Sequence, residues 1–383
     1  MKKVIAILMM ICMCSVFMEC PVQAAEVTVK APCCILMDAA SGEIIYEKNA
    51  DQQMPPASVT KIMTLLLVME AIERGELGWE DIVVGSAHAA SMGGSQIWLK
   101  EGEQFTVEEM VKCVAVASAN DCSVALAEHL AGSEEAFVAR MNARAAELEM
   151  YNTHFVNCCG LEADGHLTTA RDIAKMSAAL LAHGKIREYT TIWTDTIRDG
   201  TFGLTNTNKM IRSYNGMIGL KTGYTSDAGY CLSGAAEREG MMLIAVVLRG
   251  ETSQSRNDDV AALLNYGFAN YTSQKISPDT PLLPISVQMG KKDVVSVCLA
   301  EEKSVLLEKS RIPELIKTIE MEAWVEAPVQ AGDRVGSFTV CDADGAIVYS
   351  CDIVAAETVE RLTLGDLWSR LMRRTTFRDG NIR

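Results

Sequence analysis

Basic residues are scarce in this chain relative to acidic ones. The 383 residues include 35 Lys and Arg against 50 Asp and Glu, so the formal net charge is −15 at pH 7. Binding to nucleic acid requires a basic surface that neutralises phosphates, and this composition argues against such a partner. Sequence spacings typical of metal sites, such as C-x-x-C or paired His and Cys, are also missing. We therefore expect no metal centre, and nothing in the sequence implies an organic cofactor.

A long uninterrupted apolar run is missing as well. A basic pair, Lys2-Lys3, precedes an apolar stretch over residues 4–18, which is short for a membrane span and is followed by Glu19. Small residues ending at Ala24 then occupy the positions that a signal peptidase reads. This pattern predicts a cleaved signal peptide over residues 1–24 and export of the mature protein, with an uncleaved anchor as the alternative.

Cysteine is plentiful by contrast, with 13 residues, of which ten follow the expected signal peptide. Export would favour disulfides, yet several of these cysteines lie in apolar runs, where a free thiol behaves as a small buried hydrophobe. The sequence neighbours Cys33-Cys34 and Cys158-Cys159 are poorly placed to pair within themselves. Cysteine usage therefore leaves the redox state open.

The most informative motif is a serine and a lysine three residues apart, Ser58 and Lys61, at the expected start of an apolar helix. Side chains at i and i+3 share one helix face, so the Lys61 amine can reach the Ser58 hydroxyl. A serine hydroxyl needs an adjacent base to act as a nucleophile, and a desolvated lysine near positive charge can be that base. Taken alone, the spacing equally fits a helix-capping serine followed by a solvated lysine.

Two further motifs change this balance. Ser118-Ala119-Asn120 begins 60 residues after Ser58, and Lys221-Thr222-Gly223 begins 103 residues after Ser118. S-x-N alone is unspecific, because other triplets in the chain match it, whereas S-x-x-K and K-T-G each occur once. In this order the three motifs are similar to the set found in active-site serine penicillin-recognising enzymes.

Apolar patterning predicts strands near both ends of the first 275 residues and helices between them. Two strands are expected within residues 29–50 and three within 216–249. Helical spacing predicts helices from near Ser58 to Gly75 and over 107–117, 121–131, 134–149, 169–183 and 258–270. This arrangement favours an α+β fold in which one sheet, assembled from both ends of the segment, is covered by helices.

The remaining chain has a different composition. Residues 278–357 alternate apolar and polar side chains between Gly and Asp turns, which predicts a small all-β domain without evident chemistry. The C-terminal stretch carries leucines, Trp368 and a cluster of arginines. That pattern is typical of an amphipathic helix lying on an anionic membrane, and a helix docked on its own β-domain is the alternative.

With these motifs in place, the chain resembles the D-alanyl-D-alanine carboxypeptidases, the low-molecular-weight penicillin-binding proteins of serine peptidase family S11. The likeness runs from about residue 26 to 370, and residues 56–64 and 168–172 are close to the family's most specific segments. The resemblance implies the penicillin-binding-protein/β-lactamase-like transpeptidase fold, an antiparallel sheet covered by helices. It divides the chain into a signal peptide (1–24), a catalytic domain (25–275), a C-terminal β-domain (276–357) and an amphipathic membrane-associating tail (358–383).

The resemblance also implies an activity and its machinery. The enzyme would remove the terminal D-alanine from peptidoglycan pentapeptide stems in the cell-wall space, on the outer face of the cytoplasmic membrane, and β-lactams would inhibit it. Ser58 would attack the carbonyl between the two D-alanines, and Lys61 would take its proton. The backbone N–H groups of Ser58 and Tyr224 would form the oxyanion hole, and Ser118 would pass a proton to the leaving amine.

Substrate binding falls to a second set of residues in this comparison. Asn120 would hold the peptide of the substrate, and Lys221 and Thr222, with Gly223 completing the motif, would bind its terminal carboxylate. Arg256, 35 residues after Lys221, matches the arginine that helps to fix this carboxylate.

The chain departs from the family pattern in two places. Cys158-Cys159 stands where Pro-His is usual, and Tyr224 follows K-T-G where His or Thr is common. Three other functions remain open: a DD-endopeptidase, an inactive wall-binding homologue and a class A-like β-lactamase. The last would use a loop glutamate for deacylation, and Glu162 lies in the loop without the expected surrounding pattern. The preferred muropeptide, a vegetative or sporulation role and the oligomeric state also stay open.

Overall fold

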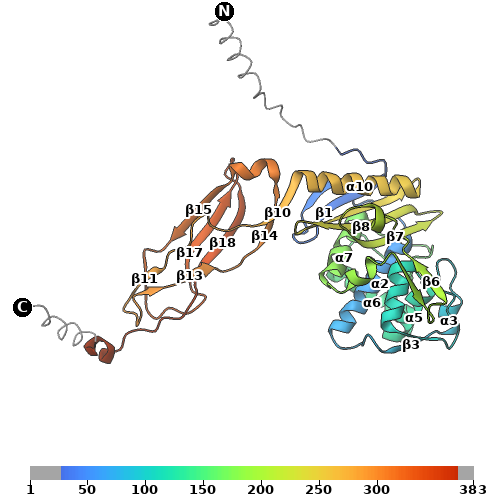
Figure 1. Cartoon of the computed structure of the whole chain (residues 1–383), viewed down its shortest axis with the longest axis horizontal. Coiled ribbons are helices and arrows are strands. Elements are labelled where there is room, and N and C mark those ends of the chain that lie inside the picture. The colour runs from blue at the N-terminus through green and yellow to red at the C-terminus, as the bar shows by residue number, and fades with distance from the viewer. Residues whose placement is uncertain (1–26, 370–383) are drawn as a thin grey trace, which may run out of the picture.

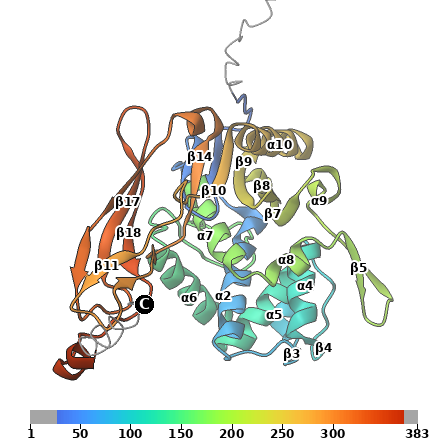
Figure 2. The same ribbon diagram turned by 60° about the vertical axis from the view of Figure 1, so that its left-hand side comes forward.

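The computed structural model describes residues 27–369. This part of the chain forms a lobe in which helices surround a sheet, and a second lobe built of strands, as Figures 1 and 2 show from two directions. The expected signal peptide lies outside the described residues. Of the expected tail over 358–383, the described part ends at residue 369.

An antiparallel sheet forms the centre of the larger lobe, with the strand order β2-β1-β9-β8-β7. It joins strands from both ends of this lobe's sequence, which confirms the expected α+β fold. Strand β1 is buried on both faces because Ile35 and Met37 pack into the larger helical core, while Leu36 packs against the opposite face. The strands are β1 (Cys33–Asp38), β2 (Ile44–Lys48), β7 (Met217–Thr225), β8 (Gly229–Arg238) and β9 (Met241–Gly250).

Helices cover both faces of this sheet (Figure 1). Helix α10 packs on one face together with the short helix around Met210, and the other long helices form the main core on the opposite face. The expected helices over 107–117, 121–131, 134–149 and 169–183 are present to within two residues. The longer helices are α2 (Lys61–Glu73), α4 (Val107–Ala117), α5 (Asn120–Ala131), α6 (Glu134–Glu147), α7 (Ala170–Ala182) and α10 (Ser253–Asn270).

Helix α10 begins at Ser253, five residues before the expected start near residue 258. Its first turn is polar and therefore lacks the apolar spacing that predicts a helix. The start is determined by a capping box instead, in which Thr252 and Ser255 exchange side-chain to backbone hydrogen bonds.

Short elements complete this lobe, and apolar patterning did not predict them. Each is too brief for a periodic signal, and their side chains are mixed in polarity. They are the 3-10 turn η1 (Ala57–Thr60), the helices α3 (Ala87–Ala90), α8 (Ile186–Thr190) and α9 (Met210–Ser213), and two two-stranded sheets, β3 (Ile82–Val84) with β4 (Gln104–Thr106) and β5 (Thr194–Ile197) with β6 (Phe202–Thr205).

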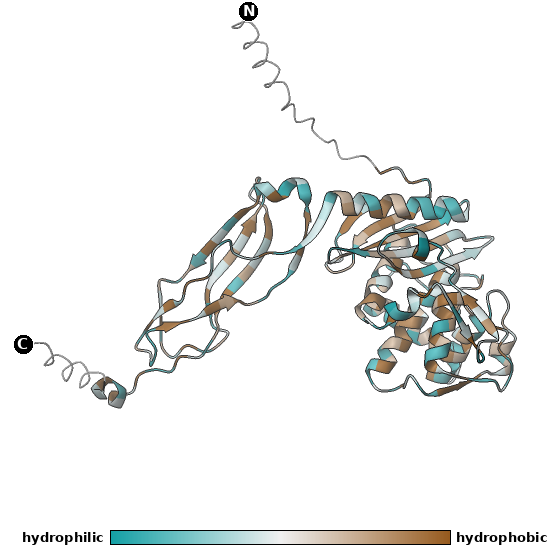
Figure 3. Ribbon diagram, viewed as in Figure 1, coloured by the Kyte–Doolittle hydropathy of each residue, from teal (hydrophilic) through white to brown (hydrophobic). Residues whose placement is uncertain are grey.

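The second lobe is all-β apart from the 3-10 turn η2 (Lys309–Glu314) within the described residues. Its strands alternate hydrophobic and hydrophilic colours in Figure 3, as one-sided burial requires. Strand β10 leaves α10 and pairs with β14, which joins the two lobes. The strands are β10 (Tyr271–Lys275), β11 (Ile285–Gln288), β12 (Val294–Val295), β13 (Val297–Leu299), β14 (Ser304–Glu308), β15 (Ile316–Met321), β16 (Trp324–Glu326), β17 (Arg334–Cys341) and β18 (Ile347–Ala355).

A helix begins at Leu364 after this lobe and continues to the end of the described residues. Leu364 is 86% exposed and Trp368 is 65% exposed, so neither side chain packs against the β-domain. Across residues 27–369, helices with the length and apolarity to cross a membrane are absent.

Candidate active site

Ser58 lies in the 3-10 turn η1, directly before helix α2. Its side chain is partly buried, and Ala57 before it has a positive φ of 48°. The turn is closed by the Thr60 hydroxyl, which donates to the Ala57 carbonyl at 2.9 Å. The structure therefore holds the Ser58 hydroxyl on a strained turn. Ser58 is not a helix cap, because the N-cap residues of η1 and α2 are Pro56 and Thr60.

Lys61 starts helix α2 and is fully buried, and its ammonium has three hydrogen-bond acceptors. It donates to Ser58 Oγ at 2.9 Å, to Asn120 Oδ1 at 2.6 Å and to the Cys159 carbonyl at 2.6 Å. Burial lowers the pKa of Lys61 to about 8, although the neighbouring Cys159, Cys158 and Asp121 oppose this shift. A measurable fraction of Lys61 is therefore neutral near pH 7, as a base for Ser58 must be.

The S-A-N motif forms the sharp turn between helices α4 and α5. Ser118 adopts the left-handed conformation with φ 63°, and Asn120 is the first residue of α5. The Asn120 amide is held by its own donation to the Gly93 carbonyl at 2.6 Å, which leaves Oδ1 for Lys61. Ser118 Oγ is buried and has no hydrogen-bond partner among the described residues. A buried hydroxyl without a partner is costly, and it is available to a bound substrate.

The K-T-G motif lies on β7, which is the edge strand of the sheet next to η1. The Lys221 ammonium is buried and donates to the Thr222 carbonyl at 2.8 Å, and Thr222 Oγ1 donates to Thr207 Oγ1 at 2.7 Å. Burial lowers the pKa of Lys221 well below its usual value, and the positive charges of Lys61 and Arg256 lower it further. Two buried amines that disfavour each other's protonation therefore face this site.

Gly223 allows β7 to approach the nucleophile closely. A Cβ at this position would lie 2.9 Å from the Pro56 carbonyl oxygen and 3.1 Å from the Ser58 nitrogen. Any larger residue would push the strand away from η1. The close approach brings the K-T-G strand alongside the backbone N–H of Ser58, where an oxyanion hole requires donors from both segments.

Comparison with known proteins identifies the family to which the chain with this site belongs. Residues 20–252 match the family model described as D-alanyl-D-alanine carboxypeptidase, and residues 271–361 match the C-terminal domain of penicillin-binding protein 5. The chain is 38% identical to the D-alanyl-D-alanine carboxypeptidase DacF of Bacillus subtilis over 361 residues, which cover 91% of this chain and 92% of the relative. The chain belongs to the D-alanyl-D-alanine carboxypeptidase family.

Solved structures agree with this assignment to the carboxypeptidase family. Penicillin-binding protein 5 from Haemophilus influenzae has a TM-score of 0.74 at 28% identity and covers 87% of this chain and 98% of its own. Penicillin-binding protein D2 from Listeria monocytogenes, solved in its ampicillin-bound form, has a TM-score of 0.58 at 33% identity over 63% of this chain and 99% of its own. The serine carboxypeptidase assignment and the penicillin-binding-protein fold are thus confirmed.

Within this carboxypeptidase fold, Arg256 reaches the K-T-G strand from α10 through Cys231, which pairs with Gly223. It is buried on α10, and its guanidinium donates to Asn257 Oδ1 at 2.8 Å, Ser253 Oγ at 3.2 Å and the Cys231 carbonyl at 3.4 Å. Burial lowers its pKa to about 10, which still leaves it charged at neutral pH. Arg256 therefore supplies positive potential near Lys221, and its direct contact with a substrate carboxylate stays a prediction.

The active-site loop over residues 157–166 contains groups to which sequence reasoning assigned no role. His166 Nδ1 accepts from the Val156 N–H at 3.0 Å, so Nε2 carries the proton and donates to Thr60 Oγ1 at 2.9 Å. Burial lowers the pKa of His166 to about 4, which keeps the ring neutral. A lone histidine in a polar loop has no sequence signal for this task, because its partners are backbone groups and a threonine 106 residues away.

Two further features bind this loop to the nucleophile. Gly160 has φ +83°, and a Cβ there would lie 1.9 Å from the Ala57 carbonyl oxygen. The Cys159 side chain is buried, and the Cys159 backbone carbonyl accepts from Lys61. At the departure from the family pattern, Cys158-Cys159, both backbone carbonyls thus accept hydrogen bonds from α2, the Cys158 carbonyl from Thr64 and the Cys159 carbonyl from Lys61.

Glu162, the loop carboxylate that a β-lactamase mechanism would need, points elsewhere. It accepts from the Asp227 N–H at 3.1 Å and from Ser226 Oγ at 3.3 Å, both in the β7–β8 turn. Hydrogen bonds from Thr225, Asp227 and Ser226 lower the pKa of Glu162. Glu162 therefore connects the loop to the strand turn, and a cavity of about 200 Å³ lies beside this connection.

Proposed function

We propose that Ser58 and Lys61 are the nucleophile and the base of this serine D-Ala-D-Ala carboxypeptidase. The observation that carries this is the 2.9 Å hydrogen bond between Lys61 Nζ and Ser58 Oγ, made by a buried amine whose pKa is lowered to about 8. Neutral Lys61 takes the proton of Ser58 as its oxygen attacks the carbonyl between the two D-alanines. The backbone N–H groups of Ser58 and Tyr224 stabilise the oxyanion.

The other site residues bind and orient the substrate in this proposal. Lys221 and Thr222 receive the terminal carboxylate, and charge pairing with it favours the protonated form of Lys221. That charge in turn disfavours protonation of Lys61 and prepares it as a base. Asn120 holds the peptide on the acyl side, and Ser118 passes a proton to the leaving amine. Water then hydrolyses the acyl-enzyme, and a β-lactam that acylates Ser58 inhibits the enzyme.

The test is D-alanine release from diacetyl-L-Lys-D-Ala-D-Ala by the purified mature chain, with Ser58→Ala as the matched control. Release by the wild type alone supports the proposal. Covalent labelling by penicillin without release would instead favour a DD-endopeptidase or a narrower substrate. A wild type that neither releases D-alanine nor is labelled would contradict the catalytic roles and favour a wall-binding protein.

The carboxypeptidase acts outside the cytoplasm in this proposal, held at the membrane surface by its C-terminal tail. Support comes from the exposed apolar side chains of Leu364 and Trp368 in the described part of the tail, followed in sequence by Arg370, Arg373 and Arg374. Sedimentation with anionic lipid vesicles tests this, and the control is the chain truncated after residue 363, which keeps the buried Val359 and its pairing with Val329. Equal sedimentation of both chains would contradict a membrane role for the tail.

A further inference from the structure

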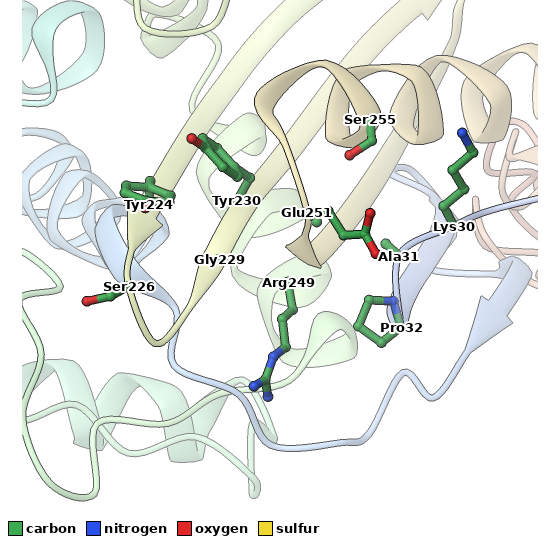
Figure 4. Close-up of a pocket in the computed structure, with 11 residues that line it drawn as sticks. Lys30, Ala31, Pro32, Tyr224, Ser226, Gly229, Tyr230, Arg249, Glu251 and Ser255 are labelled. Atoms are coloured by element: carbon green, nitrogen blue, oxygen red, sulfur yellow. The ribbon is translucent and has the colours of Figure 1, made fainter.

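A second cavity, of about 560 Å³, lies at the end of the sheet where β7 turns into β8 (Figure 4). Its walls come from the segment before β1, the β7–β8 hairpin, the end of β9 and the start of α10. The lining residues are Lys30, Ala31, Pro32, Tyr224, Ser226, Gly229, Tyr230, Arg249, Gly250, Glu251 and Ser255.

Three charged side chains line this cavity, and among the described residues they form no ion pairs. Lys30 and Arg249 are cations and Glu251 is an anion, so the wall carries an excess of positive charge. The Arg249 guanidinium has one described side-chain contact, with Met54 Sδ at 3.8 Å. The chain has a net charge of −15, so a cavity whose lysine and arginine side chains form no ion pairs with described residues favours binding of an anionic group.

The K-T-G strand leads directly into the hairpin that lines this cavity. Neighbouring residues of a strand point to opposite faces, so Gly223 faces Ser58 whereas the Tyr224 side chain lines the cavity. Tyr224 packs on Tyr230, with ring centroids 4.4 Å apart. Ser226, two residues on, lines the cavity and also bonds Glu162 of the active-site loop.

The direction of a bound substrate connects the two sites. A peptide with its terminal carboxylate at Lys221 and Thr222 and its scissile carbonyl at Ser58 runs antiparallel along the edge of β7. Gly223 and Ser226 are three residues apart, or about 10 Å along an extended strand. The third residue before the scissile bond therefore arrives at the hairpin that borders the cavity. In a peptidoglycan stem this residue is a γ-linked D-glutamate, which carries a free α-carboxylate or its amide.

We propose that this cavity is a specificity subsite for a carboxylate on the stem peptide, three residues before the scissile bond. Arg249 provides the positive charge for this carboxylate, and the Tyr224–Tyr230 pair forms an apolar wall for the peptide. This inference rests on the proposed function, because it takes the orientation of the substrate from it. It predicts that the enzyme distinguishes stems with a free α-carboxylate from stems in which that group is amidated.

The experiment measures kcat/KM for D-alanine release from two N-acetylated pentapeptides, L-Ala-γ-D-Glu-L-Lys-D-Ala-D-Ala with an acetylated lysine and its α-carboxamide. Arg249→Gln is expected to lower kcat/KM for the acid peptide about tenfold, the size expected for one charge-assisted hydrogen bond, and to leave the amide peptide unchanged. Glu251→Gln should act in the opposite direction. Lys303→Gln, which removes one positive charge from an exposed position of the β-domain, is the matched control.

Two outcomes would overturn the subsite. In the first, Arg249→Gln leaves both peptides unaffected; in the second, it slows both equally; either result means that the charge of the stem does not interact with this cavity. Release from diacetyl-L-Lys-D-Ala-D-Ala, which lacks the glutamate, reports the catalytic machinery separately. If the wild type releases nothing from any of the three peptides, the proposed function fails and the subsite falls with it.

Discussion

Acylation of Ser58 should depend on pH through Lys61, and the structure sets the shape of that dependence. Only the neutral amine can accept the proton of Ser58, and the pKa of Lys61 is lowered by burial to about 8. With that value the neutral fraction is about 1% at pH 6, about 9% at pH 7, about 50% at pH 8 and about 90% at pH 9. The rate of acylation should therefore rise about fiftyfold between pH 6 and pH 8 and less than about twofold above it.

The assay is the second-order rate constant for acylation by benzylpenicillin, followed by stopped flow or by quenching and mass measurement of the acyl-enzyme. This constant reports the free enzyme, so its inflection gives the pKa of the base before the ligand binds. Cys159→Ala should move the inflection to lower pH, because a Cys159 thiolate attracts the Lys61 ammonium and opposes its deprotonation. The backbone carbonyl that accepts from Lys61 remains in this variant.

Lys61→Arg is the control for the role of the base. A guanidinium keeps the positive charge and cannot lose its proton in this range, so the residual rate should be low and should not follow the same titration. A wild-type rate that is flat between about pH 6 and pH 9, or that falls as the pH rises, would refute Lys61 as the base. An unchanged inflection in Cys159→Ala would refute the assigned electrostatics while leaving the base in place.

Further predictions concern the supports of the site. Gly223→Ala should slow acylation at least about tenfold with only a small change in melting temperature, since its Cβ would lie 2.9 Å from the Pro56 oxygen; a wild-type acylation rate would contradict this contact. The lowered pKa of His166, about 4, means that the unfolded state binds its proton first, so stability should fall from about pH 6.5 to pH 4. In denaturant unfolding, the stability of His166→Gln should not show this fall with decreasing pH. The same fall in the variant as in the wild type would contradict the role given to His166. In the native protein a thiol reagent should modify exposed Cys298 first and buried Cys158 and Cys159 only on unfolding; their rapid native labelling would show the loop to be open.

Local chemistry explains why the contact between Ser58 and Lys61, the proposed nucleophile and base, could be predicted from the sequence. Ser58 and Lys61 are three residues apart at the start of an apolar helix, so their contact follows from helical geometry without knowledge of the rest of the fold. The 2.9 Å bond between them agrees with this expectation. The helices α4 to α7 were likewise predicted because each has a regular apolar face.

The meeting of the three motifs in one site could not be predicted from local chemistry. Asn120 is 59 residues from Lys61, and their 2.6 Å bond depends on the packing of α5 against α2. Propensity and periodicity do not encode such a contact, and only the likeness to a known motif set placed Asn120 and Lys221 in one site. The backbone groups that hydrogen-bond to site residues, such as the Cys159 carbonyl, could not be predicted even from that likeness, because every residue has a carbonyl.

Several residues around Ser58 contradict local rules, and positive φ angles and buried polar atoms without a partner also occur elsewhere in the described residues. Ala57 and Ser118 have positive φ, Ser118 Oγ has no partner among the described residues, and Lys61 and Lys221 are buried amines with lowered pKa values. Each of these features costs stability on its own. A fold selected only for stability would disperse or remove them. Around Ser58 these costs fall on the groups of the three motifs, and we expect the substrate to offset part of them by pairing with Lys221 and Ser118.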